Sequence, residues 1–196
     1  MTHAALLLLA SLSWAAPAQP EPVTQAVSEH RNDIGEIERR DDGFLHRSSG
    51  FVYPAQLGEM PSRKSRTYGP GDAEVYYSLY GGANNDAWIS VFVYPATADV
   101  SVEARNVVPA ILERFKAVES IGPAGLQPGP AGSREGWFRG NLDNYQMLTG
   151  YRLIRSGNWF VKARISIPLA GGEAATKRAV DAVAAIPWTW QATAPK

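Results

Sequence analysis

The chain has 196 residues, 45% of them hydrophobic, and its 19 basic and 19 acidic residues give a formal net charge of zero. This balance argues against nucleic-acid binding, which depends on a surplus of clustered Lys and Arg. There is no cysteine, which excludes disulfides, thiol catalysis, Cys-ligated metals and a lipid-modified N-terminal cysteine. Length and composition fit one globular domain.

The N-terminal residues have the pattern of a cleavable leader. The apolar run at 4–16 has the length of a signal-peptide core and is shorter than the ~20 residues of a membrane span. Ala16 and Ala18 are small residues at the −3 and −1 positions of a cleavage site. We therefore predict a signal peptide at 1–18, cleaved before Gln19, and a periplasmic or secreted bacterial protein.

Two alternatives to the cleaved leader stay open, a buried apolar helix and an uncleaved membrane anchor. The positive charge expected before the apolar run is limited to the N-terminal amine and His3. No later stretch approaches the length of a membrane span, so we expect no stable span after cleavage.

Residues 19–43 are predicted to be a polar linker or a short helix. Apolar residues and one histidine recur at helical spacing, at Val23, Val27, His30, Ile34 and Ile37. Gly35 weakens a helix by ~1 kcal/mol relative to Ala. A linker that ends in a strand is the equal alternative.

From Phe44 onward the dominant hydrophobic period is two, which indicates strands. The first strands are expected at 51–54, 63–68, 73–80 and 88–94. A turn at 69–72 and a loop at 81–86 join the last three into an antiparallel meander. The basic residues at 63–66 are interpreted as a solvated edge.

A helical period follows at 100–121, with one apolar stripe formed by Ala104, Val107, Val108, Ile111, Phe115 and Val118. Pro109 is expected to kink or divide this helix, because proline lacks a backbone donor. A Gly/Pro-rich loop is predicted at 122–132.

Three more strands are expected at 136–142, 146–155 and 159–167, the last two joined by a hairpin turn at 156–158. In the last strand Lys162, Arg164 and Ser166 are expected to face water and the alternate apolar residues to face the core. A second helix is predicted at 173–186, ended by Pro187.

This order predicts an α+β fold, a twisted antiparallel sheet of about six or seven strands covered by two main helices. The domain is expected at 44–190, followed by a tail at 191–196.

The element order resembles the PsbP-like fold, named for an extrinsic subunit of the photosynthetic oxygen-evolving complex and found in bacterial envelope relatives. The resemblance rests on the entry strand Ser49–Pro54, the hairpin at 75–94, the helix at 100–121 and the strand at 159–168 with its terminal helix. It implies a binding or assembly accessory. It transfers no site residue, because Leu57–Glu59 stand where that family often has a Trp.

The sequence predicts no metal site, cofactor or catalytic residue. In the mature chain only His30 and His46 remain, without H-x-x-x-H spacing. His46 is expected to be a partly exposed strand histidine, with pairing to Asp41 or Asp42 as the alternative.

Ser48 and Ser49 lie near His46 but lack the G-x-S-x-G turn of a catalytic serine, so we expect them to bend the chain into the Phe51 strand. The loop at 81–84 lacks the Lys of a phosphate-binding loop.

Paired carboxylates at strand ends leave a hydrolase open as an alternative. Glu135 and Asp143 flank one predicted strand, and Glu74 and Asp86 lie on another pair. Such chemistry requires two carboxyl groups to meet across a cleft.

Aromatic residues give the best functional signal. Tyr76, Tyr80, Phe92 and Tyr94 share the sheet face opposite the expected core, which is either an exposed binding face or a second core face under a helix. We expect a non-catalytic accessory that binds an envelope protein or small ligand through this face or the loops at 81–86 and 122–132. A purely structural envelope protein is a further alternative.

Overall fold

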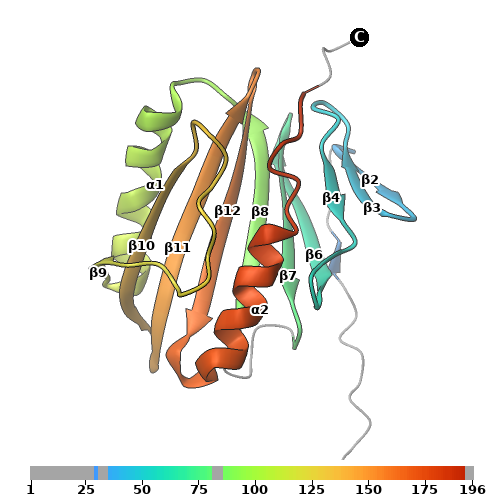
Figure 1. Cartoon of the computed structure of the whole chain (residues 1–196). Coiled ribbons are helices and arrows are strands. Elements are labelled where there is room, and N and C mark those ends of the chain that lie inside the picture. Colours follow the sequence, from blue (N-terminus) through green and yellow to red (C-terminus); the bar gives the residue numbers. More distant parts are fainter. Residues whose placement is uncertain (1–28, 31–34, 81–85, 193–196) are drawn as a thin grey trace, which may run out of the picture.

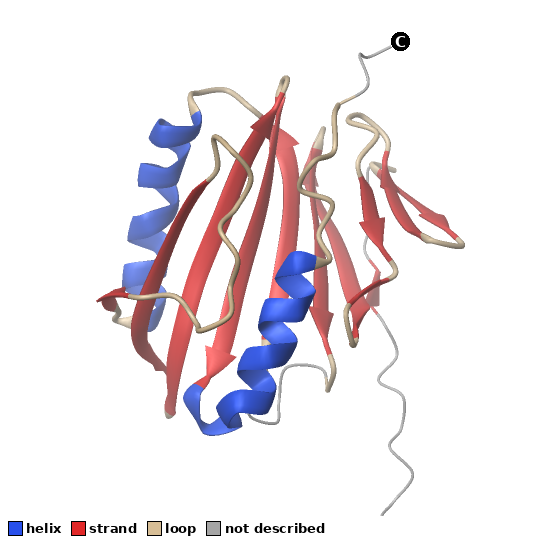
Figure 2. Cartoon of the chain, in the orientation of Figure 1, coloured by secondary structure: helices blue, strands red, loops and turns tan. Residues whose placement is uncertain are grey.

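Two helices lie on opposite faces of one large sheet in the computed structural model, which describes residues 29–30, 35–80 and 86–192 (Figures 1 and 2). The α+β class and the two-helix cover are confirmed. The predicted signal peptide and most of the loop at 81–86 lie outside the described residues.

Within the described residues the large sheet has nine strands, in the order β1-β6-β7-β8-β12-β11-β10-β9 with β5 paired to β6. All pairs are antiparallel except β1 with β6. The strands are β1 (Glu29–His30), β5 (Gln56–Leu57), β6 (Met60–Gly69), β7 (Asp72–Ser78), β8 (Trp88–Pro95), β9 (Val118–Ser120), β10 (Arg134–Leu142), β11 (Tyr145–Ser156) and β12 (Trp159–Pro168). The count exceeds the predicted six or seven because β1, β5 and β9 are only two or three residues long.

The meander and the hairpin are as predicted. β6, β7 and β8 pair in sequence order, and Ser156 of β11 lies opposite Trp159 of β12. This register leaves a two-residue turn, in which Gly157 adopts a φ of 59° that favours glycine.

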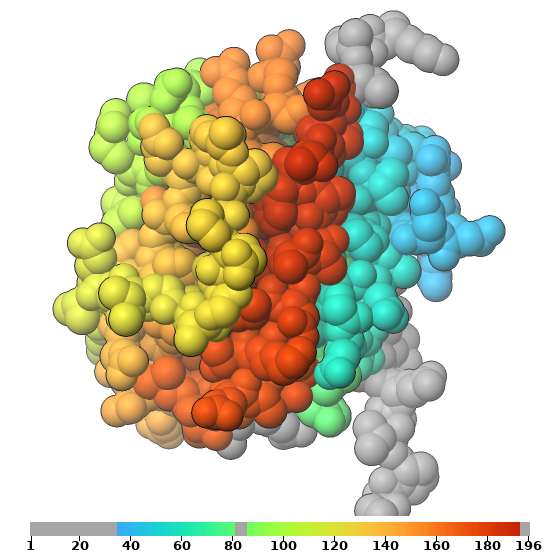
Figure 3. All heavy atoms as spheres, in the orientation of Figure 1, coloured from blue at the N-terminus to red at the C-terminus, as the bar shows by residue number. Residues whose placement is uncertain are grey.

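One face of the sheet is covered by α2 (Gly172–Ala184). Small buried residues of α2 allow the helix to lie close to the sheet, namely Ala175, Ala179, Ala182 and Val183. The alternate apolar residues of β12 face the same cluster, as predicted. Figure 3 shows this side filled by α2, the segment at 121–133 and the N-terminal strands.

The same core extends under a three-stranded sheet of β2 (Ile37–Arg40), β3 (Gly43–His46) and β4 (Val52–Pro54). β2 lies inside the range 19–43, so residues 37–40 of that range form a strand, as in the linker alternative, and not a helix. Ile37 and Phe44 are buried there, so residues before position 44 contribute to this core.

The opposite face carries α1 (Val100–Phe115), which begins at the N-cap Asp99. The helix ends at Lys116, whose φ is 45°, so it is shorter than predicted; Val118 belongs to β9 and is exposed instead of buried. α1 runs through Pro109 as one helix, so of the two predicted effects of this proline, a kink or a division, the division is wrong. α1 packs on β10 and β11 and leaves the β6–β8 half of this face without a helix.

Candidate functional site

A groove of about 660 Å³ lies on the half of the sheet face that α1 leaves uncovered. The strand register places Lys64, Tyr76, Ser90 and Arg164 in one cross-strand row, with Arg66, Glu74, Phe92 and Lys162 in the next. The residues that line the groove are Arg63, Lys64, Arg66, Tyr68, Glu74, Tyr76, Trp88, Ser90, Phe92, Arg114, Phe115, Arg164 and Ser166. Its volume is in the range of small-molecule sites, roughly 300–1,000 Å³.

Of the four aromatic residues predicted to form a binding face, two line the groove and two do not. Tyr76 and Phe92 line the groove and are half-buried. Tyr94 lies closer to α1, where its hydroxyl donates to Glu103 Oε1 at 2.7 Å. Burial, followed by the hydrogen bond to Glu103, raises the pKa of Tyr94. Tyr80 is 54% exposed and does not line the groove.

The basic character of the groove was not predicted from the sequence, where residues 63–66 were interpreted as a solvated edge. Among the residues that the structure describes, five that line the groove are Arg or Lys, and Glu74 is the acidic one. Glu74 lies opposite Arg66 and accepts a hydrogen bond from the Tyr68 hydroxyl. The spacing of Lys64 and Arg66 on either side of the buried Ser65 could have predicted it, because alternate residues of a strand share one face.

Arg164 lines the groove from β12, on the side next to α1. Its guanidinium lies over the Phe115 ring at 5.3 Å, and Arg114 lies over the same ring at 5.8 Å. The Nη2 nitrogen of Arg164 is buried and has no hydrogen-bond partner among the described residues. Burial, followed by repulsion from Arg114, lowers the pKa of Arg164.

The expectation that Lys162, Arg164 and Ser166 face water is wrong. Ser166 is buried, and Lys162 and Arg164 are half-buried. Lys162 lies over Phe92 at 4.6 Å and over Tyr94 at 4.9 Å, so cation–π contacts hold it against the sheet. These side chains are shielded from water because α1 covers part of this face of the sheet and the groove lies beside the helix.

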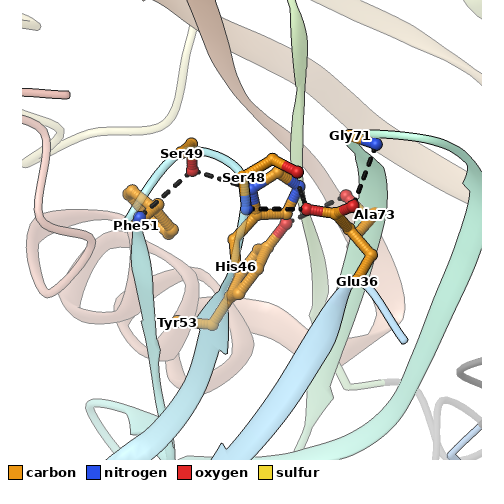
Figure 4. Close-up of polar contacts among 8 residues, drawn as sticks. All are labelled: Glu36, His46, Ser48, Ser49, Phe51, Tyr53, Gly71 and Ala73. Atoms are coloured by element: carbon orange, nitrogen blue, oxygen red, sulfur yellow. Dashed lines mark hydrogen bonds and ion pairs between the residues drawn. The ribbon is translucent and has the colours of Figure 1, made fainter. Parts of the chain in front are cut away.

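His46, Glu36 and Ser49 form a second cluster, beneath the three-stranded sheet (Figure 4). His46 Nδ1 lies 2.7 Å from Ser49 Oγ, and Nε2 lies 3.6 Å from Glu36 Oε1. A ring proton on Nε2 faces the carboxylate favourably, which leaves Nδ1 to accept from the Ser49 hydroxyl. Glu36 also accepts the backbone N–H of Ser48 at 2.9 Å and of Gly71 at 3.1 Å.

This cluster has the residue types of a catalytic triad but no access for a substrate. The side chains of His46 and Ser49 are fully buried, so the expectation of a partly exposed His46 is wrong. Ser49 Oγ accepts the Phe51 N–H at 3.1 Å, which is the chain-bending role predicted for this serine. The cluster joins β2 and the turn after β3 to the turn between β6 and β7.

Burial sets the charge state of the cluster. It lowers the pKa of His46 to about 4, although the charge of Glu36 acts in the opposite direction. Burial also acts to raise the pKa of Glu36, but hydrogen bonds from Ser48 and Gly71 and the nearby His46 outweigh it and lower that pKa. At neutral pH the cluster is therefore a neutral imidazole beside a carboxylate.

The carboxylates considered for hydrolysis are engaged elsewhere. Glu135 pairs with the buried Arg152 at 2.8 Å, and Asp86 pairs with Arg178 of α2 at 2.8 Å. Asp143 is exposed in the turn between β10 and β11. Of the four carboxylates considered, only Glu74 is among the described residues that line the groove, so neither predicted pair meets there.

Within the ranges 29–30, 35–80 and 86–192, no three His, Asp or Glu side chains are grouped closely enough to hold a metal ion. No helix in the same ranges has the length and apolar composition needed to cross a bilayer. No protein-family model matches the chain, and no curated protein matches it.

Proposed function

We propose that this protein is a non-catalytic accessory of the bacterial envelope that binds a small ligand or a partner protein in the groove beside α1. The observation that carries the proposal is the half-covered sheet face, where Tyr76, Phe92 and Trp88 meet a basic wall in one hollow. Aromatic residues with a few polar groups around a concave surface are typical of binding sites.

Two features of the sequence support the envelope and the accessory role. The pattern of residues 1–18 supports export, and the element order similar to the PsbP-like fold supports binding or assembly in place of catalysis. N-terminal sequencing of protein recovered from the periplasm should begin at Gln19; material that retains Met1 would contradict export through a cleaved leader.

Trp88 provides a local probe of the groove. We expect small-molecule or protein fractions of an envelope extract to shift the Trp88 indole signal in NMR spectra of the mature protein, because Trp88 lines the groove. The Trp188 indole, which donates to Val183 O at 2.7 Å under the opposite face, should not move. If no fraction moves the Trp88 signal, the proposal is wrong.

Replacing Tyr76 with alanine should weaken this binding about five- to thirtyfold, since truncation of a central aromatic contact costs on the order of 1–2 kcal/mol. Tyr145→Ala is the matched control, because Tyr145 is exposed on β11 and does not line the groove. NMR titration of both variants with the active fraction measures the difference; equal affinities would place the binding elsewhere.

A further inference from the structure

We propose that the groove binds a small anionic molecule, with a carboxylate or a phosphate group held by Arg164 and Arg114 and the rest of the molecule lying on the aromatic lining. This inference rests on the proposed function, in that it names the class of ligand for the same groove.

The charge of the lining is the first reason. In the described part of the chain, five cations and one carboxylate line the groove, and the carboxylate already accepts a hydrogen bond from Tyr68. Arg63 donates to the main-chain carbonyls of Ser78 and Leu79. Arg114 and Arg164 share the Phe115 ring and repel each other, so an anion placed between them would relieve this repulsion.

The geometry of Arg164 is the second reason. The guanidinium of Arg164 lies against the Phe115 ring, which offers no oxygen acceptor to its N–H groups. A buried Nη2 without a partner among the described residues is costly unless another acceptor reaches it. A planar carboxylate or a phosphate accepts two parallel hydrogen bonds from such a fork.

The neighbours of Arg164 provide neutral donors and stacking surfaces at the same place. Ser90 lies opposite Arg164 on β8, and Ser166 is the next residue of β12 on this face. Both line the groove, as do Tyr76 and Phe92. The arrangement therefore suits a molecule with one anionic end and a flat or apolar body.

The first experiment titrates the mature protein with benzoate and with phenyl phosphate, followed through the Trp88 indole signal. Benzamide, the neutral counterpart of benzoate, is the matched probe. We expect one or both anions to bind at least tenfold more tightly than benzamide, because a charge-assisted hydrogen bond contributes about 1.5–3 kcal/mol.

Arg164→Gln should weaken binding of the preferred anion about ten- to a hundredfold. The same change should leave the melting temperature unchanged or raise it, because it removes a half-buried cation that faces Arg114. A merely structural arginine would show the reverse. Arg105→Gln is the control, since Arg105 is exposed on the same helix as Arg114 but does not line the groove.

Failure of this inference is distinct from failure of the proposed function. Benzamide binding as tightly as the anions, or unchanged anion affinity in Arg164→Gln, overturns the inference and leaves the groove as a binding site. An envelope extract depleted on an anion-exchange resin gives a second distinction. If the depleted extract still moves the Trp88 signal, the anionic class is wrong, whereas no response to any probe or fraction overturns both proposals.

The two anionic groups can then be separated. Phosphatase treatment of the resin-bound material should abolish the response if the ligand carries a phosphate monoester and should leave it intact if the ligand carries a carboxylate. Loss of the response on protease treatment would instead identify a protein partner and overturn the small-molecule inference.

Discussion

Replacement of Phe115 by alanine should lower the free energy of unfolding by about 3–5 kcal/mol, the usual cost of removing a buried phenylalanine. Phe115 is only 1% exposed and is the last residue of α1. It lies in the cluster that joins α1 to β10, β11 and β12 through Phe138, Leu153 and Phe160. Phe115 also lines the groove, so the resulting cavity would alter the groove as well.

Urea denaturation of Phe115→Ala and of Val118→Ala would measure this effect against a matched control. Val118 was expected on the same apolar stripe but is 68% exposed, so its truncation should change stability by no more than about 0.5 kcal/mol. Similar losses in the two variants would contradict the short helix and the position of Phe115. Phe115→Ala should also weaken anion binding, because it removes the ring beneath Arg164.

The second large effect concerns acid stability. The unfolded chain protonates His46 near the ordinary pKa of 6.5, whereas the folded chain does so only near pH 4. Between these two values the unfolded state binds more protons, so the free energy of unfolding should fall as the pH falls through this window. The loss should amount to about 3 kcal/mol. The lowered pKa of Glu36 acts in the same direction at more acidic pH.

His46→Phe should flatten the stability profile between pH 6.5 and 4, because phenylalanine does not titrate. Its baseline stability should be lower, since the hydrogen bond to Ser49 is lost. The comparison is His30→Phe in the mature chain, which should keep the wild-type slope. If the free energy of unfolding of His46→Phe still falls between pH 6.5 and 4, the acid sensitivity does not come from His46 and the prediction is wrong.

Local sequence patterns predicted the regular elements with strong periodicity. β12 alternates apolar and polar residues from Val161 to Ile167, and α2 has an alanine-rich stripe and is followed by Pro187. Such signals depend only on neighbours within a few residues, so one sequence suffices to read them. The short strands β2 and β9 have too few residues to establish a period.

The groove and the buried cluster could not be predicted in the same way, because their residues meet only through tertiary packing. Arg164 and Arg114 belong to a strand and a helix, and period two cannot tell whether the second face of a strand is covered. His46 is buried beside Glu36, which precedes β2, and Glu36 in turn accepts the N–H of Gly71 in the turn between β6 and β7. The local sequence around His46 indicates neither neighbour.

The carboxylate of Glu36 defines where the folding unit must start. It accepts main-chain N–H groups from Ser48 and Gly71, two turns that lie far apart in the chain. A fragment that begins at Phe44 would leave both donors without their acceptor, and loss of the acceptor at the buried Gly71 N–H costs about 1–3 kcal/mol. Residues before position 44 therefore hold these two turns together, and shortened versions of this protein need to retain them.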